Sequence, residues 1–395
     1  MSMTLPEQDE PRPGPPGRPH LAHGMGKTLV AADWPPLTDE EVSLVLGGVR
    51  AGAVVTWHSP RPWSAAGLVS WRGAGLAVKR HHVSVRTISQ LATEHALAGY
   101  LRARGLPVPA VIPLHGGATA VQRGEFSYEA YRLAAGIDVY RDAPSWSPFA
   151  ALPHARSAGA ALARLHRAAE GFAAPGRPPG VLISSCAVIL AADPVGQVTR
   201  VLARRPGLAR WMARRPWRDD LTGHLLPAIN RAGPLGRRLP RQWGHGDWHP
   251  SNLTWTGAGP EARVAGIFDL GLANRTFAVH DLAIAIERST VAWLDLAESG
   301  RADADLDAMD ALLDGYESVR PLSPAEATAL PEILPVAHVE FALSEIEYFA
   351  DVTGSAANAE LAYDSYLLGH ARWFAAPAGA AVLDHLRQRA GRDRD

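Results

Sequence analysis

The sequence predicts an α+β protein with two lobes, a small N-terminal lobe built on an antiparallel sheet and a larger, mainly helical C-terminal lobe. Three observations support this fold class. Short β-like segments separated by turns with Pro and Gly occupy residues 53–132. Apolar residues at helical spacing dominate after about residue 154. Residues 242–273 interrupt the helical pattern with a polar loop and two strand-like segments.

The small lobe is predicted from its capping and turn signals. Thr38 and Glu41 have the spacing of a capping box at a helix start. Strands are expected at about residues 53–57, 67–71 and 76–80, and a helix from about 84 to 104, where Gly-Leu-Pro ends it. Two further strands at about 111–115 and 126–132 would complete a five-stranded sheet.

The helical lobe is predicted with less regular boundaries. Residues 154–169 have helical spacing of apolar positions, whereas residues 173–240 are rich in Arg and Pro and are expected to be irregular. Helices are expected again from about residue 279. The predicted segments are therefore a disordered Pro/Gly-rich leader (1–36), the small lobe (37–132), the helical lobe (133–385) and a charged tail (386–395).

The overall composition excludes several classes of protein. The 395 residues include 39 basic and 40 acidic side chains, a net charge of −1, whereas nucleic-acid binders usually have a basic excess. No apolar run approaches the roughly 18 residues of a membrane span, and the first residues lack the pattern of a signal peptide. We therefore expect a cytoplasmic monomer or homodimer without nucleic-acid or membrane partners. The single cysteine, Cys186, lies in an apolar segment and is expected to be a buried thiol.

Lysine is rare in this chain and its position is informative. It occurs only at Lys27 and Lys79, while arginine supplies the other basic residues. Lys79 ends the third predicted strand. A lysine offers a compact charge on a flexible stem that arginine does not reproduce, so Lys79 is a candidate functional residue.

The densest group of polar residues is Gly-His-Gly-Asp-Trp-His-Pro-Ser-Asn-Leu at positions 244–253. It contains Asp247 and Asn252, and Asp269 follows an apolar strand a little later. Carboxylate and amide oxygens suit Mg²⁺, and phosphoryl transfer needs such a metal, a cation over the phosphates and a carboxylate beside the hydroxyl. The alternative, a zinc site at His245 and His249, is disfavoured by Pro250 and the lack of a third nearby ligand.

The pattern His-Gly-Asp-x-x-x-x-Asn followed by an apolar strand ending in Asp resembles the aminoglycoside phosphotransferase and choline-kinase-like superfamily, a relative of the protein kinases. The resemblance extends from about residue 40 to 375 and includes the strand lysine, a glutamate on the next helix, Leu165-His166 and Asp281-Leu-Ala. It implies a protein-kinase-like fold and an O-phosphotransferase that uses ATP, or GTP as an alternative, with Mg²⁺.

The resemblance also implies residue roles. Asp247 would be the catalytic base, and Asn252 and Asp269 would hold Mg²⁺. Lys79 would contact the phosphates and pair with Glu94. His245 would brace the loop and Asp281 would fasten it. The hinge near residues 129–132 would read adenine through backbone groups, which assigns the nucleotide to Glu129, Ala130 and Tyr131.

The nucleotide-covering turn departs from the superfamily's usual pattern. Residues 58–64 read His-Ser-Pro-Arg-Pro-Trp-Ser and contain no glycine. Backbone groups or the hydroxyls of Ser59 and Ser64 could take over its contacts. Leu270 replaces the phenylalanine that often follows the metal-binding aspartate, and it keeps an apolar contact at that position.

The acceptor is indicated only by charge and by analogy. Glu340, Glu347 and Asp351 share one face of a predicted helix, so a cleft-facing stripe would favour a cationic amine; a solvated helix face is the alternative. Residues 105–109 and 315–326 resemble the homoserine-kinase-like branch.

The hypothesis is therefore a small-molecule kinase acting on an amine-bearing hydroxyl compound. Its alternatives are a nucleotide-binding pseudokinase and a protein Ser/Thr kinase, which the missing Ala-Pro-Glu segment disfavours. The arginine-rich run 204–218 is interpreted as a solvated helix face.

Overall fold

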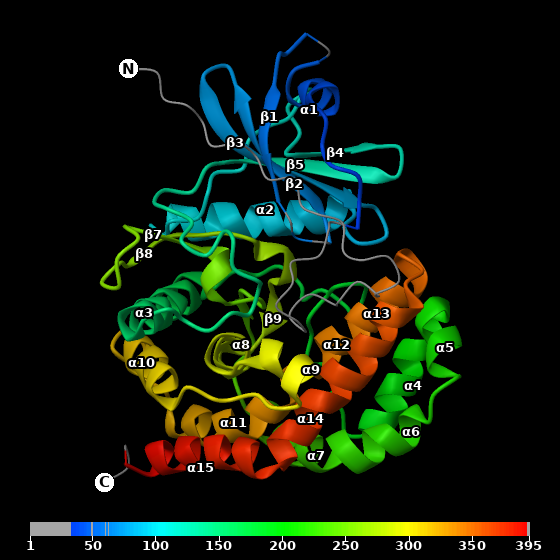
Figure 1. The fold of residues 1–395 in the computed structure, drawn as a ribbon, viewed down its shortest axis with the longest axis vertical. Helices are drawn as coiled ribbons and strands as arrows, with labels where there is room; N and C mark the ends of the chain where they lie inside the picture. Colours follow the sequence, from blue (N-terminus) through cyan, green and yellow to red (C-terminus); the bar gives the residue numbers. More distant parts are fainter. Residues whose placement is uncertain (1–32, 49, 60, 62, 393–395) are drawn as a thin grey trace.

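The computed structural model describes residues 33–392 apart from residues 49, 60 and 62. The N-terminal sheet stands at the top of Figure 1, helix α2 (Ile88–Ala103) runs beneath it, and the helices of the C-terminal lobe fill the lower part. The predicted α+β fold with two lobes is confirmed. A site between the lobes can therefore receive side chains from both.

The sheet of the small lobe has five antiparallel strands in the order β1-β2-β3-β5-β4. Their bounds are β1 Val54–His58, β2 Ala65–Trp71, β3 Ala74–His82, β4 Ala120–Arg123 and β5 Phe126–Arg132. The register places Lys79 on β3 opposite Glu129 on β5. The lysine and the glutamate thus occupy neighbouring positions on two adjacent strands of the sheet.

The strand predicted at residues 111–115 is wrong. Val111 makes an isolated bridge to Tyr131, and the fourth strand of the sheet is β4 instead. Pro109 and Pro113 lie on either side of Val111 and have no N–H to donate, so a continuous ladder cannot form there. The correct strand was missed because it is short and precedes a tight turn at Gly124.

Capping chemistry sets the helix starts of the small lobe. In α1 (Asp39–Leu46) the predicted capping box is present: Glu41 N–H donates to Thr38 Oγ1 at 3.2 Å, and Thr38 N–H to the Glu41 carboxylate at 3.4 Å. Helix α2 begins after Thr87, whose capping box uses Gln90. It starts later than predicted because Ser84 is engaged with the ring of His82 at 2.7 Å.

The end of the predicted leader is packed rather than disordered. Trp34 stacks on His82 with ring centroids 4.9 Å apart and meets Phe126 edge-on. The hydroxyl of Tyr348, in the C-terminal lobe, donates to Asp33 at 2.8 Å. Residues 33–36 therefore belong to the folded protein. The remainder of the predicted leader, residues 1–32, lies outside the described residues.

The C-terminal lobe is built from helices packed around a large apolar core. Their bounds are α3 Leu152–Ala169, α4 Pro194–Arg204, α5 Pro206–Met212, α6 Trp217–Asp220, α7 Leu226–Gly236, α8 Ala278–Thr290, α9 Trp293–Ser299, α10 Leu306–Glu317, α11 Pro324–Ile333, α12 Val339–Glu347, α13 Ala356–Leu361, α14 Leu368–Ala375 and α15 Pro377–Arg392. Residues 386–392, predicted as a tail, continue α15.

The segment predicted to be irregular contains four helices, α4 to α7. Pro194 and Pro206 occupy first-turn positions of α4 and α5. Proline is well tolerated there because the N–H it lacks would have no helical partner. Pro194 and Pro206 thus begin helices in a segment that was predicted to be irregular.

Helices α3 and α10 cross at unusually close range. A Cβ on Gly159 would lie 1.9 Å from the carbonyl oxygen of Leu312, and a Cβ on Gly315 would lie 1.9 Å from that of Arg156. Glycine on both helices lets the backbones touch. The two helices lie next to each other at the left of the C-terminal lobe in Figure 1.

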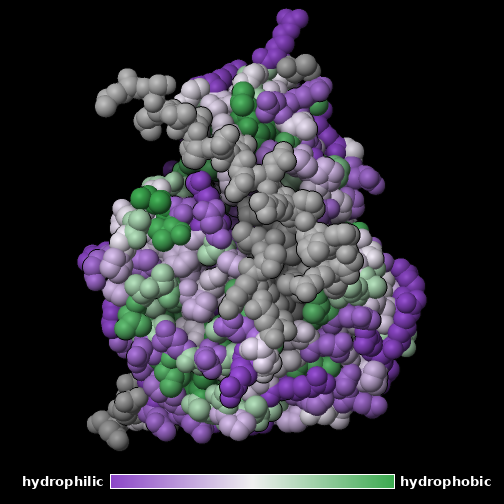
Figure 2. All heavy atoms as spheres, viewed as in Figure 1, coloured by the Kyte–Doolittle hydropathy of each residue, from purple (hydrophilic) through white to green (hydrophobic). Residues whose placement is uncertain are grey.

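Within the described residues, none of the helices combines the length and apolarity needed to cross a membrane. The face drawn in Figure 2 shows small hydrophobic patches separated by hydrophilic residues. Cys186 is buried in the core, where burial raises the pKa of its thiol well above the usual value, as expected for an unreactive cysteine.

Candidate functional site

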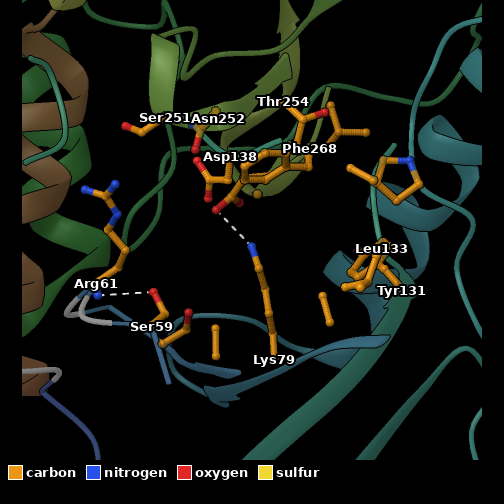
Figure 3. A pocket seen from close by; sticks show the side chains of 18 of the residues that line it. Ser59, Arg61, Lys79, Tyr131, Leu133, Asp138, Ser251, Asn252, Thr254 and Phe268 are labelled. Carbon is orange, nitrogen blue, oxygen red and sulfur yellow. Dashed lines mark hydrogen bonds and ion pairs between the residues drawn. The ribbon is translucent and has the colours of Figure 1, made fainter. Parts of the chain in front are cut away.

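A cavity of about 340 Å³ lies between the lobes. The small lobe contributes Lys79 and residues of the β1–β2 turn, and the C-terminal lobe contributes Asp247, Asn252 and Asp269. In Figure 3, Lys79 extends from the sheet toward the opposite wall, where Asn252 and Phe268 lie. The cavity thus gathers the polar residues that the sequence had singled out from separate segments.

Two small ladders in the C-terminal lobe bring the polar segments together. Strands β6 (Gln242–Gly244) and β9 (Asn274–Thr276) pair, and strands β7 (Leu253–Trp255) and β8 (Val264–Ile267) pair. The loop between β6 and β7 therefore lies beside the loop between β8 and β9. The N–H of Phe268 donates to the carbonyl of Asn252 at 3.1 Å, which places Asp269 next to the 245–252 loop.

Asp281 on α8 holds the start of this loop. Its carboxylate accepts the N–H groups of His245 and Gly246, both at 2.7 Å, and contacts His166 Nε2 at 2.9 Å. These contacts outweigh the effect of burial and lower the pKa of Asp281 to about 2. The ring of His245 in turn lies 3.0 Å from the carbonyl of Phe268 and so links the two loops.

Gly246 explains why the loop motif contains glycine. Its φ is +76°, and a Cβ there would lie 2.2 Å from the carbonyl oxygen of Leu272. A side chain would push the second loop away from the first. The glycine therefore permits the close approach that sets Asp247 and Asp269 in one cavity.

Asp247 is almost completely buried and fully engaged. Its carboxylate accepts from Arg288 and from Asn252 Nδ2, the latter at 3.0 Å, and lies 3.4 Å from His249 Nε2. Burial acts to raise the pKa of Asp247, but Arg288 and His249 outweigh it and hold the pKa well below the usual range. Asp247 is therefore an ionised hydrogen-bond acceptor at neutral pH.

Zinc binding at the two histidines finds no support in the geometry. The ring nitrogens of His245 contact Phe268 O and Asp247 N, and those of His249 contact Ser251 Oγ and Asp247. Across the described part of the chain, no group of three or more His, Cys, Asp or Glu side chains could hold a metal ion.

Asp269 pairs with Lys79 across the cavity. Lys79 Nζ lies 2.8 Å from Asp269 Oδ2, the contact drawn as a dashed line from Lys79 in Figure 3. Burial alone would raise the pKa of Asp269, but the Lys79 ammonium keeps it lowered. Asp269 also has a left-handed backbone, φ 62°, a strained conformation that is concentrated at functional sites in proteins.

The expected partnership of Lys79 with Glu94 is wrong. Glu94 lies 3.2 Å from Arg86 Nε and 3.0 Å from Arg177 Nη1. Both arginines also donate to the carbonyl of Gly271, at 2.6 and 2.8 Å. Glu94 therefore supports the loop that carries Asp269 through two arginines, and the sequence pattern could not distinguish this arrangement from a direct pair with Lys79.

Of the predicted hinge residues, Glu129 and Tyr131 line the cavity. The carbonyl of Ala130 accepts from Ile112 N at 2.8 Å, and the N–H of Arg132 donates to Ala110 at 2.9 Å. The Glu129 side chain is buried and accepts from His81, His95 and Tyr131 at 2.5 to 3.0 Å. The Ala130 carbonyl, the Arg132 N–H and the Glu129 carboxylate are therefore engaged within the small lobe, and the reading of adenine by backbone groups of residues 129–131 stays a prediction. Leu133 and Ala134 follow β5 directly and line the cavity.

The acidic stripe does not face the cavity. Glu340 accepts from Ser185 Oγ and from Val188 N, Glu347 pairs with Arg205, and Asp351 pairs with Arg210 at 2.9 Å. The expected cationic subsite at these residues is therefore wrong. Two of the partner arginines belong to the run 204–218, so the acidic stripe and the basic run pair with each other.

Sequence reasoning missed three residues of the site. Arg288 on α8 contacts Asp247, and Arg61 and Asp138 line the cavity. Arg61 and Arg288 could not be singled out from the sequence by residue type, because nearly all basic residues of this chain are arginine. A usable signal existed for Arg288, since it lies seven residues after Asp281 and therefore on the same face of one helix.

The donor set fits a magnesium–nucleotide complex. Asn252 and Asp269 offer hard oxygen ligands on adjacent loops, and Mg²⁺ commonly uses one or two protein ligands together with phosphate oxygens. Lys79 supplies a cation on the other wall of the same cavity. The residues present therefore suit the cofactors that the sequence implied.

Comparison with known proteins places the chain in a family. Residues 62–322 match the model of the phosphotransferase enzyme family. A homoserine kinase of Gluconacetobacter diazotrophicus is 30% identical over 257 residues, which is 62% of this chain and 62% of that protein. A homoserine kinase of Gluconobacter oxydans is 31% identical over 188 residues, 48% of this chain and 51% of that protein. The chain thus spans roughly half to two thirds of these relatives.

Solved structures share the fold at lower identity. An aminoglycoside phosphotransferase from Alicyclobacillus acidocaldarius superposes with a TM-score of 0.53 at 18% identity, covering 91% of this chain and 98% of its own. An amicoumacin kinase in complex with AMP-PNP and Ca²⁺ superposes with a TM-score of 0.54 at 13% identity, covering 84% of this chain and 90% of its own. A microcompartment-associated aminopropanol kinase superposes with a TM-score of 0.53 at 16% identity, covering 82% of this chain and 92% of its own. These likenesses establish the fold.

Proposed function

This chain belongs to the phosphotransferase enzyme family, and on that basis we propose that it transfers the γ-phosphate of ATP to a hydroxyl group of a small molecule. One observation carries the proposal. Lys79 from the sheet and Asp269 from the helical lobe meet at 2.8 Å in the cavity that Asp247 and Asn252 also line. This set supplies a cation, metal ligands and a carboxylate, which are the parts that phosphoryl transfer requires.

The nucleotide would lie between the lobes. Asn252 and Asp269 would hold Mg²⁺, and Lys79 would bind the α- and β-phosphates. Leu133 and Ala134, which follow the predicted hinge residues 129–131 and line the cavity, would offer further backbone groups for adenine. When bound, Mg²⁺ would neutralise charge on the phosphates and orient them.

Asp247 would bind and orient the acceptor hydroxyl. The acceptor oxygen forms a bond to the γ-phosphorus while the bond from that phosphorus to the oxygen bridging toward ADP breaks. The hydroxyl proton passes to the Asp247 carboxylate and then to solvent, which leaves ADP and a phosphate ester. Because Arg288 and His249 keep the pKa of Asp247 low against the effect of burial, the carboxylate acts mainly by orientation and accepts the proton late.

The acceptor is proposed to be a small amino alcohol or another amine-bearing compound. Support comes from the names of the homoserine kinase relatives and of the aminopropanol kinase that shares the fold. Asp138 lines the cavity, and burial raises the pKa of its carboxyl group. An ammonium group beside Asp138 would stabilise its ionised form. Asp138 thus replaces the acidic stripe as the proposed contact for an amine.

Thermal unfolding with and without ligand tests the proposal. A ligand at about a hundredfold over its Kd stabilises the folded state by about 2.7 kcal/mol. Wild type is expected to shift upward with ATP and Mg²⁺ but not with ATP and EDTA, whereas Asp269→Ala is expected not to shift. The matched control is Asp351→Ala, because Asp351 is an exposed carboxylate paired with Arg210 away from the cavity.

Turnover is then measured as ADP release with homoserine, 1-amino-2-propanol, aminoglycosides and amine-free alcohols. Release with an amino alcohol and its loss in Asp247→Asn would support the proposed reaction. Nucleotide binding without turnover of any acceptor would instead indicate a nucleotide-binding pseudokinase. A wild-type protein that shifts with neither ATP nor GTP would refute both.

A further inference from the structure

The turn between β1 and β2 carries an arginine that reaches into the cavity. The N–H of Arg61 donates to Ser59 Oγ at 3.2 Å, and its guanidinium Nη1 donates to Ser145 Oγ at 2.5 Å. Ser145 belongs to the other lobe. In Figure 3, Arg61 and Lys79 both extend from the small lobe toward the wall that holds Asp138 and Asn252.

The charges around Arg61 are those of the proposed phosphate site. Burial lowers the pKa of its guanidinium, and the carboxylates of Asp138, Asp247 and Asp269 oppose this effect. Two of these carboxylates are the proposed base and the proposed metal ligand. Arg61 lines the same cavity as Asp247 and Asp269, so its charge can act on both groups.

The composition of the turn favours a side-chain donor there. A glycine-rich turn covers phosphates with backbone N–H groups, but residues 58–64 contain no glycine, and prolines occupy positions 60 and 62. Proline has no N–H to donate. The turn therefore offers fewer backbone donors than a glycine-rich turn. Arg61 adds a guanidinium, which presents several donors in a planar fork that matches phosphate oxygens.

We propose that Arg61 is a further catalytic residue that binds the γ-phosphoryl group. This inference rests on the proposed function, since it assumes ATP in the cavity. Lys79 would serve the α- and β-phosphates and Arg61 the group that is transferred. Its charge would compensate the charge on the phosphoryl oxygens as the bond to ADP breaks, as arginines supplied to other phosphoryl-transfer sites do.

A purely structural role is the competing explanation. Arg61 could hold the lobes together through Ser145 and affect every ligand of the cavity alike. The two roles differ in one measurable property. A γ-phosphate contact distinguishes ATP from ADP, whereas a lobe contact does not.

The test measures the affinities of AMP-PNP and ADP, each with Mg²⁺, by titration calorimetry. Arg61→Ala is expected to weaken AMP-PNP about tenfold or more and ADP less than about twofold, and to lower kcat by roughly 10³-fold, the lower end of the effect of such arginines. Arg61→Lys should recover part of both losses. Ser145→Ala should keep the wild-type ratio of AMP-PNP to ADP affinity. Arg72→Ala is the matched control, because Arg72 lies on the β2–β3 turn against Trp71.

Equal weakening of AMP-PNP and ADP in Arg61→Ala would overturn the assignment while leaving the proposed function intact. So would a Ser145→Ala variant that reproduces the Arg61→Ala pattern. An unchanged kcat with a raised KM for the acceptor would also overturn it, because Arg61 would then bind the acceptor. A wild-type protein that binds neither nucleotide would remove the proposed function and this inference together.

Discussion

Arg288 donates to the carboxylate of Asp247, and this ion pair is almost entirely shielded from solvent. The guanidinium also lies over the rings of Trp146 and Phe341, 4.7 and 4.8 Å from their centroids. Asp281, seven residues earlier on the same helix, holds the backbone of the loop that carries Asp247. Helix α8 thus positions both the backbone and the carboxylate of the proposed catalytic residue.

Arg288→Gln is expected to lower kcat about 100-fold or more. One Asp247 oxygen loses its ion-pair partner, and a displacement of the carboxylate by about 1 Å can lower the rate by that factor. The KM for ATP should change little. The folded-state pKa of Asp247 is depressed in the wild type, so it stays ionised as the pH falls toward its usual value. In Arg288→Gln that pKa should rise, and a new acidic limb should appear in the profile of kcat against pH.

Arg288→Lys should restore part of the activity and remove the new acidic limb. Circular dichroism and the ADP affinity verify that each variant is folded. If the pH profile of Arg288→Gln matches that of wild type, Arg288 does not control the ionisation of Asp247.

Glu340 should make the stability of the protein depend on pH. Burial raises the pKa of Glu340 from 4.5 to about 7, although backbone N–H groups at 187–189 act against it. The sign follows from the raised pKa: this stabilising contribution is complete below pH 4.5 and is lost as the pH rises through 7. A shift of this size corresponds to a few kcal/mol of unfolding free energy.

Glu340→Gln cannot ionise and should lack this loss, so its unfolding free energy should fall less than that of wild type between pH 5 and 8. Urea unfolding at several pH values measures the difference. Parallel curves for the two proteins would show that Glu340 is not the responsible group. Asp351→Asn is the control, since Asp351 is exposed on the same stretch of chain.

Glu94→Ala should destabilise the fold by about 3–5 kcal/mol, because it leaves the buried guanidinium groups of Arg86 and Arg177 without their carboxylate. Glu94→Gln should cost less, since one acceptor oxygen remains. The Kd for ADP of folded Glu94→Gln should change less than that of Lys79→Ala. An effect of Glu94→Gln on nucleotide affinity as large as that of Lys79→Ala would favour a direct partnership with Lys79 after all.

Gly159→Ala should destabilise the C-terminal lobe by several kcal/mol, because its Cβ would meet the backbone of α10. Gly99→Ala on α2 offers a matched control, since a Cβ there would have no atom within 4 Å. That change should stabilise the protein by up to about 1 kcal/mol through helix propensity. Thermal unfolding of both variants measures the two effects. Equal changes in Tm for Gly159→Ala and Gly99→Ala would contradict the close contact between α3 and α10.

Local chemistry was readable from the sequence. The capping box of Thr38 and Glu41, the three-strand core of the sheet and the polar loop at 244–253 appear where they were expected. Each depends on residues within a few positions of one another. The rarity of lysine likewise singled out Lys79, which lines the cavity.

Partnerships across the fold were decided by tertiary structure. Glu94 and Lys79 both occupy expected elements, yet each pairs with a residue far away in sequence, Glu94 with Arg177 and Lys79 with Asp269. The acidic stripe has the predicted helical spacing, but Glu340 meets the segment at residues 185–188. Glu347 and Asp351 meet Arg205 and Arg210. Periodicity determines which residues share a face, whereas the packing of other elements determines what that face meets. The sequence by itself therefore determined the kind of site, and only the folded arrangement decided which charges complete it.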